Sequence, residues 1–292
     1  MTAPDPLDAL LAAVALSTTP VEPDPTFAAA LRARVEHALL QPRPSARENV
    51  MTSTDTQSTV VRSGEVVYTS IWTPNAARAA AFYGAVLGWQ VESGSRAYSR
   101  QVTNASAPLG LQGGQRPTTF LCFAVADVDI AVARVRAAGG SAGEPNDEPW
   151  GRVADCVDDQ GLAFALRSGP RSPAPDVTAP GALTYLTLEV PDSTRARAFY
   201  GSVLGWEFSP GRVADGWGVT TDGAELRPMI GLWGGRAGDA VVTPMYVVAD
   251  VDAAVATVRS AGGTSTEPER QPYGTSAECR DDQGVRFYLV QY

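Results

Sequence analysis

Few residue types in this chain are able to perform acid–base, nucleophilic or metal chemistry. The 292-residue sequence contains no lysine, and its only histidine is His37. Schiff-base catalysis by lysine is therefore excluded, and so is a histidine base or histidine metal ligand after His37. Three cysteines remain, Cys122, Cys156 and Cys279, and without histidine or lysine as a base none is expected to act as a nucleophile.

One carboxylate, Glu189, lies on a predicted strand whose two faces differ in polarity. Leu186, Leu188 and Val190 alternate along it and are expected to pack against helices. The opposite face, with its neighbouring strands, gives the candidate ligand-binding residues Tyr185, Thr187, Glu189, Thr243, Met245, Arg286 and Tyr288. Glu189 is either a base or amine anchor, which makes it the one weak catalytic candidate, or a structural partner of Arg286. The need of a half-buried carboxylate for a partner favours the structural interpretation.

The corresponding face in the first half of the chain is aromatic and small rather than charged. Its candidate ligand-binding residues are Tyr68, Ser70, Trp72, Phe120, Cys122 and Ala165, with Ala124 and Ala163 beside them. Aromatic walls opposite small residues suit a flat apolar or aromatic ligand held by stacking. The alternative is that these aromatic side chains simply fill the core.

The elements that position both faces occur twice in the sequence. The stretch Phe-Tyr-Gly-x-Val-Leu-Gly-Trp begins at Phe82, and a close copy begins at Phe199. Apolar spacing predicts that each copy ends an amphipathic helix, with a polar cap at the start and glycine in the left-handed conformation at the end. The predicted caps are Asn75 and Gly88 in the first copy, and Asp192 and Gly205 in the second. Two copies of this arrangement indicate a duplicated domain.

The repeat divides the chain into five segments. The helical pattern Phe27, Leu31, Val35, Leu39 marks an N-terminal arm. We predict an arm over 1–50, a linker over 51–64, a first domain over 65–168, a Pro/Ser/Gly-rich linker over 169–181 and a second domain over 182–292. The arm is expected to dock on the domains, with dimerisation or partner binding as alternatives.

Charge and hydropathy exclude two classes of partner. The formal net charge of −9 argues against nucleic acid, which requires a basic face. No apolar run approaches the roughly 20 residues needed to span a bilayer, and the acidic N-terminus does not resemble a secretory signal. A cytoplasmic location is the simplest expectation.

Four segments, found in order in both halves, resemble the glyoxalase / bleomycin-resistance / extradiol-dioxygenase superfamily. They are Phe-Tyr-x-x-Val-Leu-Gly-Trp, Val-Ala-Asp-Val-Asp, Pro-(Trp/Tyr)-Gly and Asp-Asp-Gln-Gly. The resemblance implies an α+β protein of two tandem vicinal-oxygen-chelate domains. In each, paired βαβββ units would close a curved sheet into a cup with helices outside and the ligand inside.

Metal-using members of this family place histidine and glutamate ligands on strands that line the cup. Carried over by motif, these positions are Tyr68, Phe120 and Ala165 in the first domain and Tyr185, Thr243 and Tyr288 in the second. None is a good ligand for a divalent metal. We therefore predict no metal site and no cofactor.

Three functions are compatible with these observations. The first is a metal-independent protein that binds an apolar or aromatic small molecule, as in drug sequestration or resistance. The second is a glyoxalase-like or biosynthetic lyase, isomerase or oxygenase that uses Tyr, Glu or a bound cofactor. The third is a regulatory protein that binds a partner through the arm.

The arm is predicted to lie outside both domain cores. A variant that starts at Met51 should therefore fold and retain ligand binding, with an unfolding midpoint close to that of the full chain. Thermal unfolding followed by circular dichroism measures this. A large fall in the midpoint, or insolubility, would instead make the arm an integral packing element.

Overall fold

The computed structural model describes residues 62–94, 97–148, 150–170 and 174–292. The predicted N-terminal arm and most of the first linker lie outside these residues.

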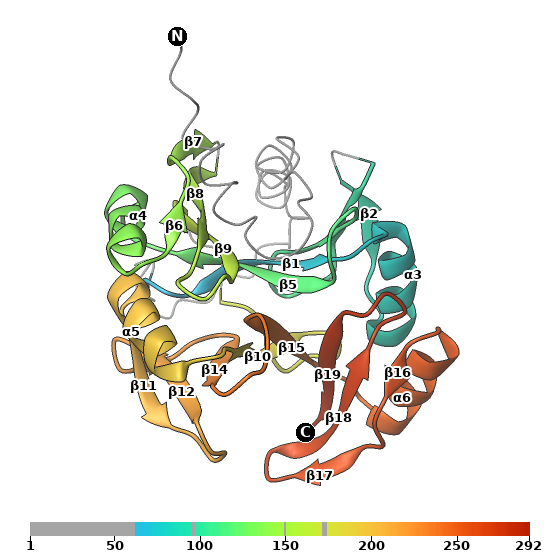
Figure 1. The fold of residues 1–292 in the computed structure, drawn as a ribbon. Coiled ribbons are helices and arrows are strands. Elements are labelled where there is room, and N and C mark those ends of the chain that lie inside the picture. Colours follow the sequence, from blue (N-terminus) through green and yellow to red (C-terminus); the bar gives the residue numbers. More distant parts are fainter. Residues whose placement is uncertain (1–61, 95–96, 149, 171–173) are drawn as a thin grey trace, which may run out of the picture.

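The first domain is a nine-stranded mixed sheet with helices α3 and α4 (Figure 1). The strand order is β2-β3-β4-β1-β5-β9-β8-β6, and β7 pairs with β8. The elements are β1 (Val66–Trp72), α3 (Ala76–Leu87), β2 (Val91–Ser93), β3 (Ser99–Val102), β4 (Leu109–Gln112), β5 (Thr118–Ala124), α4 (Val128–Ala137), β6 (Ser141–Ala142), β7 (Asn146–Glu148), β8 (Gly151–Val157) and β9 (Ala163–Ser168).

The second domain repeats this scheme in a ten-stranded sheet of order β11-β12-β14-β10-β15-β19-β18-β16. Strand β13 pairs with β12, and β17 pairs with β18. The elements are β10 (Leu183–Glu189), α5 (Ser193–Leu204), β11 (Trp206–Pro210), β12 (Gly216–Thr221), β13 (Ala224–Glu225), β14 (Met229–Trp233), β15 (Val241–Val247), α6 (Val251–Ser260), β16 (Thr264–Ser265), β17 (Glu269–Gln271), β18 (Gly274–Arg280) and β19 (Arg286–Gln291).

Each sheet consists of two βαβββ units joined at its centre. In the first, β1 pairs antiparallel with β5, while β1 and β5 pair parallel with β4 and β9. The expected α+β fold is confirmed. Strands of two or three residues such as β6, β7, β13, β16 and β17 were not predicted, because so few residues show no periodicity.

The predicted helix caps are confirmed. The Asn75 side chain accepts hydrogen bonds from Ala77 and Arg78, and Asp192 does the same for α5. Gly88 and Gly205 close these helices with φ of 69° and 74°, a conformation that favours glycine. Helix α4 begins after Asp127, whose carboxylate accepts a hydrogen bond from the backbone N–H of Ile130.

Strand alternation places the two faces as expected. Leu186, Leu188 and Val190 are fully buried in the core that contacts the helices. The opposite face of each sheet is concave (Figure 1). We call the face with Tyr68, Ser70 and Trp72 the first cup, and the face with Tyr185, Thr187 and Glu189 the second cup.

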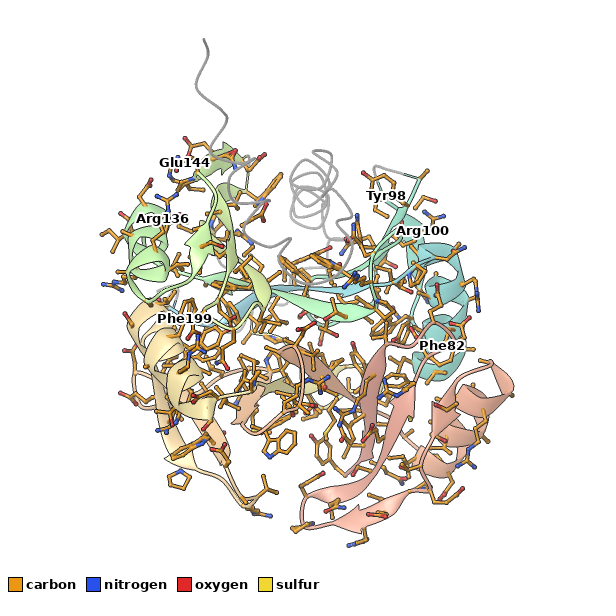
Figure 2. All side chains as sticks on the ribbon, in the orientation of Figure 1. Phe82, Tyr98, Arg100, Arg136, Glu144 and Phe199 are labelled. Carbon is orange, nitrogen blue, oxygen red and sulfur yellow. The ribbon has the colours of Figure 1, made fainter. Side chains whose placement is uncertain are left out.

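One hydrophobic core joins the two domains. The sheets lie back to back, with α3 beside α6, α4 beside α5, and the cups opening at opposite ends (Figure 1). The Phe82 ring lies 6.2 Å from Phe287, and Phe199 lies 6.2 Å from Phe164. Figure 2 shows Phe82 and Phe199 on opposite sides of the molecule, where its two halves meet. The buried face of each repeated helix therefore packs partly against the other domain.

The repeated Asp-Asp-Gln-Gly segment forms polar contacts across this interface. Tyr200 donates to Asp158 at 2.9 Å, and Tyr83 donates to Asp281 at 3.2 Å. The Gln160 amide contacts both the backbone N–H and the carbonyl of Asp192, and Gln283 contacts Asn75 in the same way. One arginine of the opposing helix completes each copy, through the ion pair Arg195–Asp159 in one and Arg78–Asp282 in the other. Each segment thus holds the start of the other domain's first helix.

None of the helices in the described part of the chain combines the length and the apolar character needed to cross a membrane.

Tyr200→Phe and Tyr83→Phe should each lower the free energy of unfolding by about 1.5–3 kcal/mol at neutral pH, the range for a hydrogen bond to a charged group. Chemical denaturation measures this, with Tyr273→Phe as the matched control, at an exposed tyrosine whose hydroxyl lies 3.4 Å from Ser276 Oγ. A loss no larger than that of the control would contradict the role given to these tyrosines.

The cost of Tyr200→Phe should also increase with pH. Burial raises the pKa of Asp158, and the Tyr200 hydroxyl opposes this by stabilising the carboxylate. Without the hydroxyl, the pKa of Asp158 in the folded state rises further above its value in the unfolded state. Ionising Asp158 then costs the folded protein more, so the variant loses more stability than wild type as the pH increases. Denaturation at about pH 5 and about pH 7 should show the larger difference from wild type at the higher pH. An equal difference at both values would exclude this coupling.

Candidate functional site

The three positions of the first cup that correspond to metal ligands in the family converge in one cluster. Tyr68, Phe120 and Ala165 are buried together with Cys122 and Trp150. Strand pairing accounts for this, since Cys122 lies opposite Tyr68 on one side and beside Ala165 on the other. The cluster is apolar apart from the Tyr68 hydroxyl, the Cys122 thiol and the Trp150 indole N–H.

Trp72 and Phe120 form an aromatic contact in the first cup. Their ring centroids are 4.7 Å apart and the planes differ by 11°, which is a parallel stack. Phe120 is buried and Trp72 is partly buried, so the pair presents a flat aromatic surface at the edge of the cluster. The small residues Ala163 and Ala165 lie on the neighbouring strand β9.

Several polar groups are buried in the first cup. Ser70 Oγ, Gln112 Oε1 and Trp150 Nε1 have no hydrogen-bond partner within the described residues. The Arg167 side chain is 3% exposed and donates to the carbonyls of Trp150 at 3.3 Å and Pro170 at 2.8 Å. Its burial lowers the pKa of Arg167. This cup therefore combines aromatic surface with polar atoms that lack partners.

Cys122 is not an activated nucleophile. Burial raises its pKa to about 12, although the nearby Arg167 charge acts in the opposite direction. Cys156 and Cys279 are buried in the shared core, as expected for small packing residues.

The second cup has a charged network at its centre. Arg286 Nη1 donates to both carboxylate oxygens of Glu189 at 2.7 Å, which confirms the predicted pair. Arg236 donates to Glu189 Oε2 at 2.9 Å, and Thr243 donates to Oε1 at 2.7 Å. Four hydrogen bonds from three side chains hold this carboxylate in place. This geometry favours the structural interpretation of Glu189 over a role as base.

A second carboxylate completes the network. Arg286 Nε donates to Glu278 at 2.7 Å, and the Tyr288 hydroxyl donates to Glu278 at 3.0 Å while accepting from Arg286. Burial raises the pKa of Glu278, but the hydrogen bonds and charge of Arg286 outweigh it, so the net pKa is lowered. Burial also raises the pKa of Tyr288. At neutral pH the network therefore holds an ionised Glu278 and a neutral Tyr288.

The second cup is more open than the first. Tyr185, Met245 and Tyr288 are half-buried there, whereas Tyr68, Cys122 and Ala165 at corresponding positions of the first cup are buried. Trp233, the last residue of β14, is 38% exposed.

The residues at the family's metal-ligand positions do not fit a metal ion. No histidine or carboxylate is present at these positions, which are Tyr68, Phe120 and Ala165 in the first cup and Tyr185, Thr243 and Tyr288 in the second. The part of the chain that the structure describes also has no cluster of three or more His, Cys, Asp or Glu side chains that could hold one. No chemical step is therefore assigned to a metal in this chain.

Sequence reasoning placed the expected residues on the cup faces but missed several others. Arg167 lies on strand β9 and Glu278 on strand β18, and the same alternation of strand residues would have found both. Gln112 lies beside Trp72 across β1 and β4, a pairing that only the sheet topology reveals. Arg236 is in the connection between β14 and β15, where no periodic pattern exists.

Both domains match family models. Residues 65–166 match the Glyoxalase/Bleomycin resistance protein/Dioxygenase superfamily, and residues 185–290 match a Glyoxalase-like domain. The anthracycline biosynthesis protein DauV of Streptomyces sp. (strain C5) is 25% identical over 269 residues, which cover 78% of this chain and 93% of DauV. The anthracycline biosynthesis protein DnrV of Streptomyces peucetius is 33% identical over 112 residues, or 35% of this chain and 41% of DnrV.

Solved structures share the fold at low identity. The Mn(II)-bound glyoxalase from Novosphingobium aromaticivorans superposes with a TM-score of 0.61 at 18% identity, covering 79% of this chain and 83% of that one. The 2,3-dioxygenase LapB from Pseudomonas sp. KL28 gives 0.58 at 13% identity, covering 79% and 93%. With one family model matched in each half and the fold shared with these structures, the chain belongs to the glyoxalase, bleomycin resistance protein and dioxygenase superfamily as a tandem member.

Proposed function

We propose that this protein binds a planar aromatic small molecule in its first cup without the help of a metal. The proposal rests on the residues at the family's metal-ligand positions, which are Tyr68, Phe120 and Ala165 in this cup. They lie next to the parallel Trp72–Phe120 stack. Stacking on an aromatic wall contributes about 0.5–1.5 kcal/mol beyond the burial of the ring itself. A flat ring system gains most from such a wall.

The curated relatives support this class of ligand. Both are named for anthracycline biosynthesis, and anthracyclines are fused-ring aromatic compounds. We therefore infer a fused-ring aromatic ligand for this chain. The proposed role is binding, as in sequestration, and a cytoplasmic location remains a prediction.

A biosynthetic or glyoxalase-like enzyme is the second candidate function, and the second cup is the observation that favours it. Tyr288 and Glu278 share a proton-carrying hydrogen bond beside Arg286, and all three are only partly buried. In an enzyme, the ionised Glu278 would be the proton acceptor and the neutral Tyr288 the proton donor for a ligand at the open face. Turnover of a carbonyl substrate that is lost in Glu278→Gln would favour the enzyme over the binding protein.

Trp72→Ala should weaken the binding of a soluble planar probe, anthraquinone sulfonate, at least tenfold. The substitution removes both the stacking wall and its buried area, and about 1.4 kcal/mol corresponds to one decade in Kd. Calorimetric titration measures the change. Trp233→Ala is the matched control because it removes the same side chain from the second cup, and Glu189→Gln should also bind nearly normally.

The opposite pattern would assign the working site to the other domain. Normal binding by Trp72→Ala together with weak binding by Trp233→Ala or Glu189→Gln would show that the second cup holds the ligand.

The purified protein should contain no stoichiometric Zn, Ni, Mn or Fe, and a chelator should leave probe binding unchanged. The reason is that the six corresponding positions provide no suitable ligand. Elemental analysis before and after dialysis against chelator measures this. Near-stoichiometric metal whose removal weakens binding would refute metal independence.

A further inference from the structure

We infer that the ligand of the first cup is an oxygenated aromatic ring system, and that Ser70 and Gln112 select it by hydrogen bonding to its hydroxyl and keto groups. This inference rests on the proposed function of that cup and names the class of ligand more closely.

Ser70 and Gln112 lie next to the aromatic stack. Gln112 on β4 is the register partner of Trp72 on β1, and Ser70 is the partner of Phe120 on β5. Paired residues of neighbouring strands point to the same face of a sheet, about 5 Å apart. A ring stacked on Trp72 or Phe120 would therefore have both polar side chains at its edge.

The two side chains are buried without partners. Ser70 is 0% and Gln112 is 2% exposed, and neither Ser70 Oγ nor Gln112 Oε1 has a hydrogen-bond partner within the described residues. Buried polar atoms in folded proteins are nearly always hydrogen-bonded to protein, water or ligand, because desolvation without a partner is unfavourable. Two such atoms beside one aromatic stack indicate that a ligand supplies the missing partners.

The atom types define what the ligand must offer. The free atom of Gln112 is a carbonyl oxygen, which only accepts, so the ligand must present a donor such as a phenolic hydroxyl. Ser70 both donates and accepts. The unpartnered Trp150 Nε1, on the wall formed by Tyr68 and Phe120, only donates and therefore requires an acceptor such as a quinone oxygen. A hydroxyquinone satisfies all three.

The second cup does not share this arrangement. Strand pairing places Trp233 beside Glu189 where the first cup has Gln112 beside Trp72. Trp233 thus takes the place of the Gln112 amide, and Glu189 takes the place of the stacked Trp72 ring. The Glu189 carboxylate already accepts hydrogen bonds from Arg236, Thr243 and Arg286. Recognition of ring oxygens through an amide is therefore confined to the first cup.

The test compares anthraquinone sulfonate with its dihydroxy derivative, two soluble probes that differ only in hydroxyl groups. Titration of the full chain should give at least fivefold tighter binding of the dihydroxy probe, because a site built to bond a hydroxyl rejects the analogue that lacks it. Gln112→Met and Ser70→Ala should each weaken the dihydroxy probe more than the plain probe, so that this ratio falls at least threefold. The visible absorption band of the dihydroxy probe should shift on binding to wild type and shift less in Gln112→Met.

The controls separate this inference from the proposed function. Gln90→Met, at an exposed glutamine, should keep the wild-type ratio, and Trp72→Ala should weaken both probes equally. Equal affinity of wild type for both probes, or an unchanged ratio in both Gln112→Met and Ser70→Ala, would overturn the inference while the binding function stands. If neither probe binds wild type, both the inference and the proposed function fail. If Gln112→Met does not fold, Ser70→Ala decides alone.

Discussion

Two buried tyrosine–aspartate hydrogen bonds, Tyr200 to Asp158 and Tyr83 to Asp281, connect the halves of this molecule. Each aspartate also accepts from two backbone N–H groups of its own turn, so a turn in one domain and a helix in the other are fixed by one side chain. A buried carboxylate is unfavourable unless such donors surround it. The two domains are therefore mutually dependent at the positions where the sequence repeats most clearly. Because the backs of the sheets meet here, the cups must open at opposite ends (Figure 1).

This constraint explains why the two cups differ while their scaffolds do not. The residues that join the domains lie on the core faces of the strands, on the helices and in the turns, and alternation places the cup residues on the other face. A substitution in a cup therefore leaves the interface intact. Trp72 and Gln112 occupy one strand pair of the first sheet, and Glu189 and Trp233 occupy the same pair of the second. The duplication has kept the register and changed the chemistry.

The sequence predicted the fold well because its signals are local or periodic. Caps such as Asn75 and Asp192, the closing glycines and the alternation around Leu186 each depend on a few neighbouring residues. The role of the Asp-Asp-Gln-Gly segment was not predictable in this way, because Gln160 and Asp192 meet only after the two domains have packed. For the same reason the face of each cup was predictable, but the pairing of side chains within it was predictable only in part. Arg286 was expected to pair with Glu189, whereas Arg236, from a connection without periodicity, was missed.

The two cups differ in whether their buried polar groups have hydrogen-bond partners among the described residues. In the second, Glu189 accepts from Arg236, Arg286 and Thr243, and Glu278 is neutralised by the same Arg286, so a ligand there would have to displace existing bonds. In the first, Ser70 and Gln112 offer atoms whose partners are missing from the described residues. A ligand gains more from bonds to unpartnered buried atoms than from exchanging bonds that are already made. This difference supports the proposal of a polar-edged aromatic ligand in the first cup, whereas the charged groups of the second cup are paired with one another.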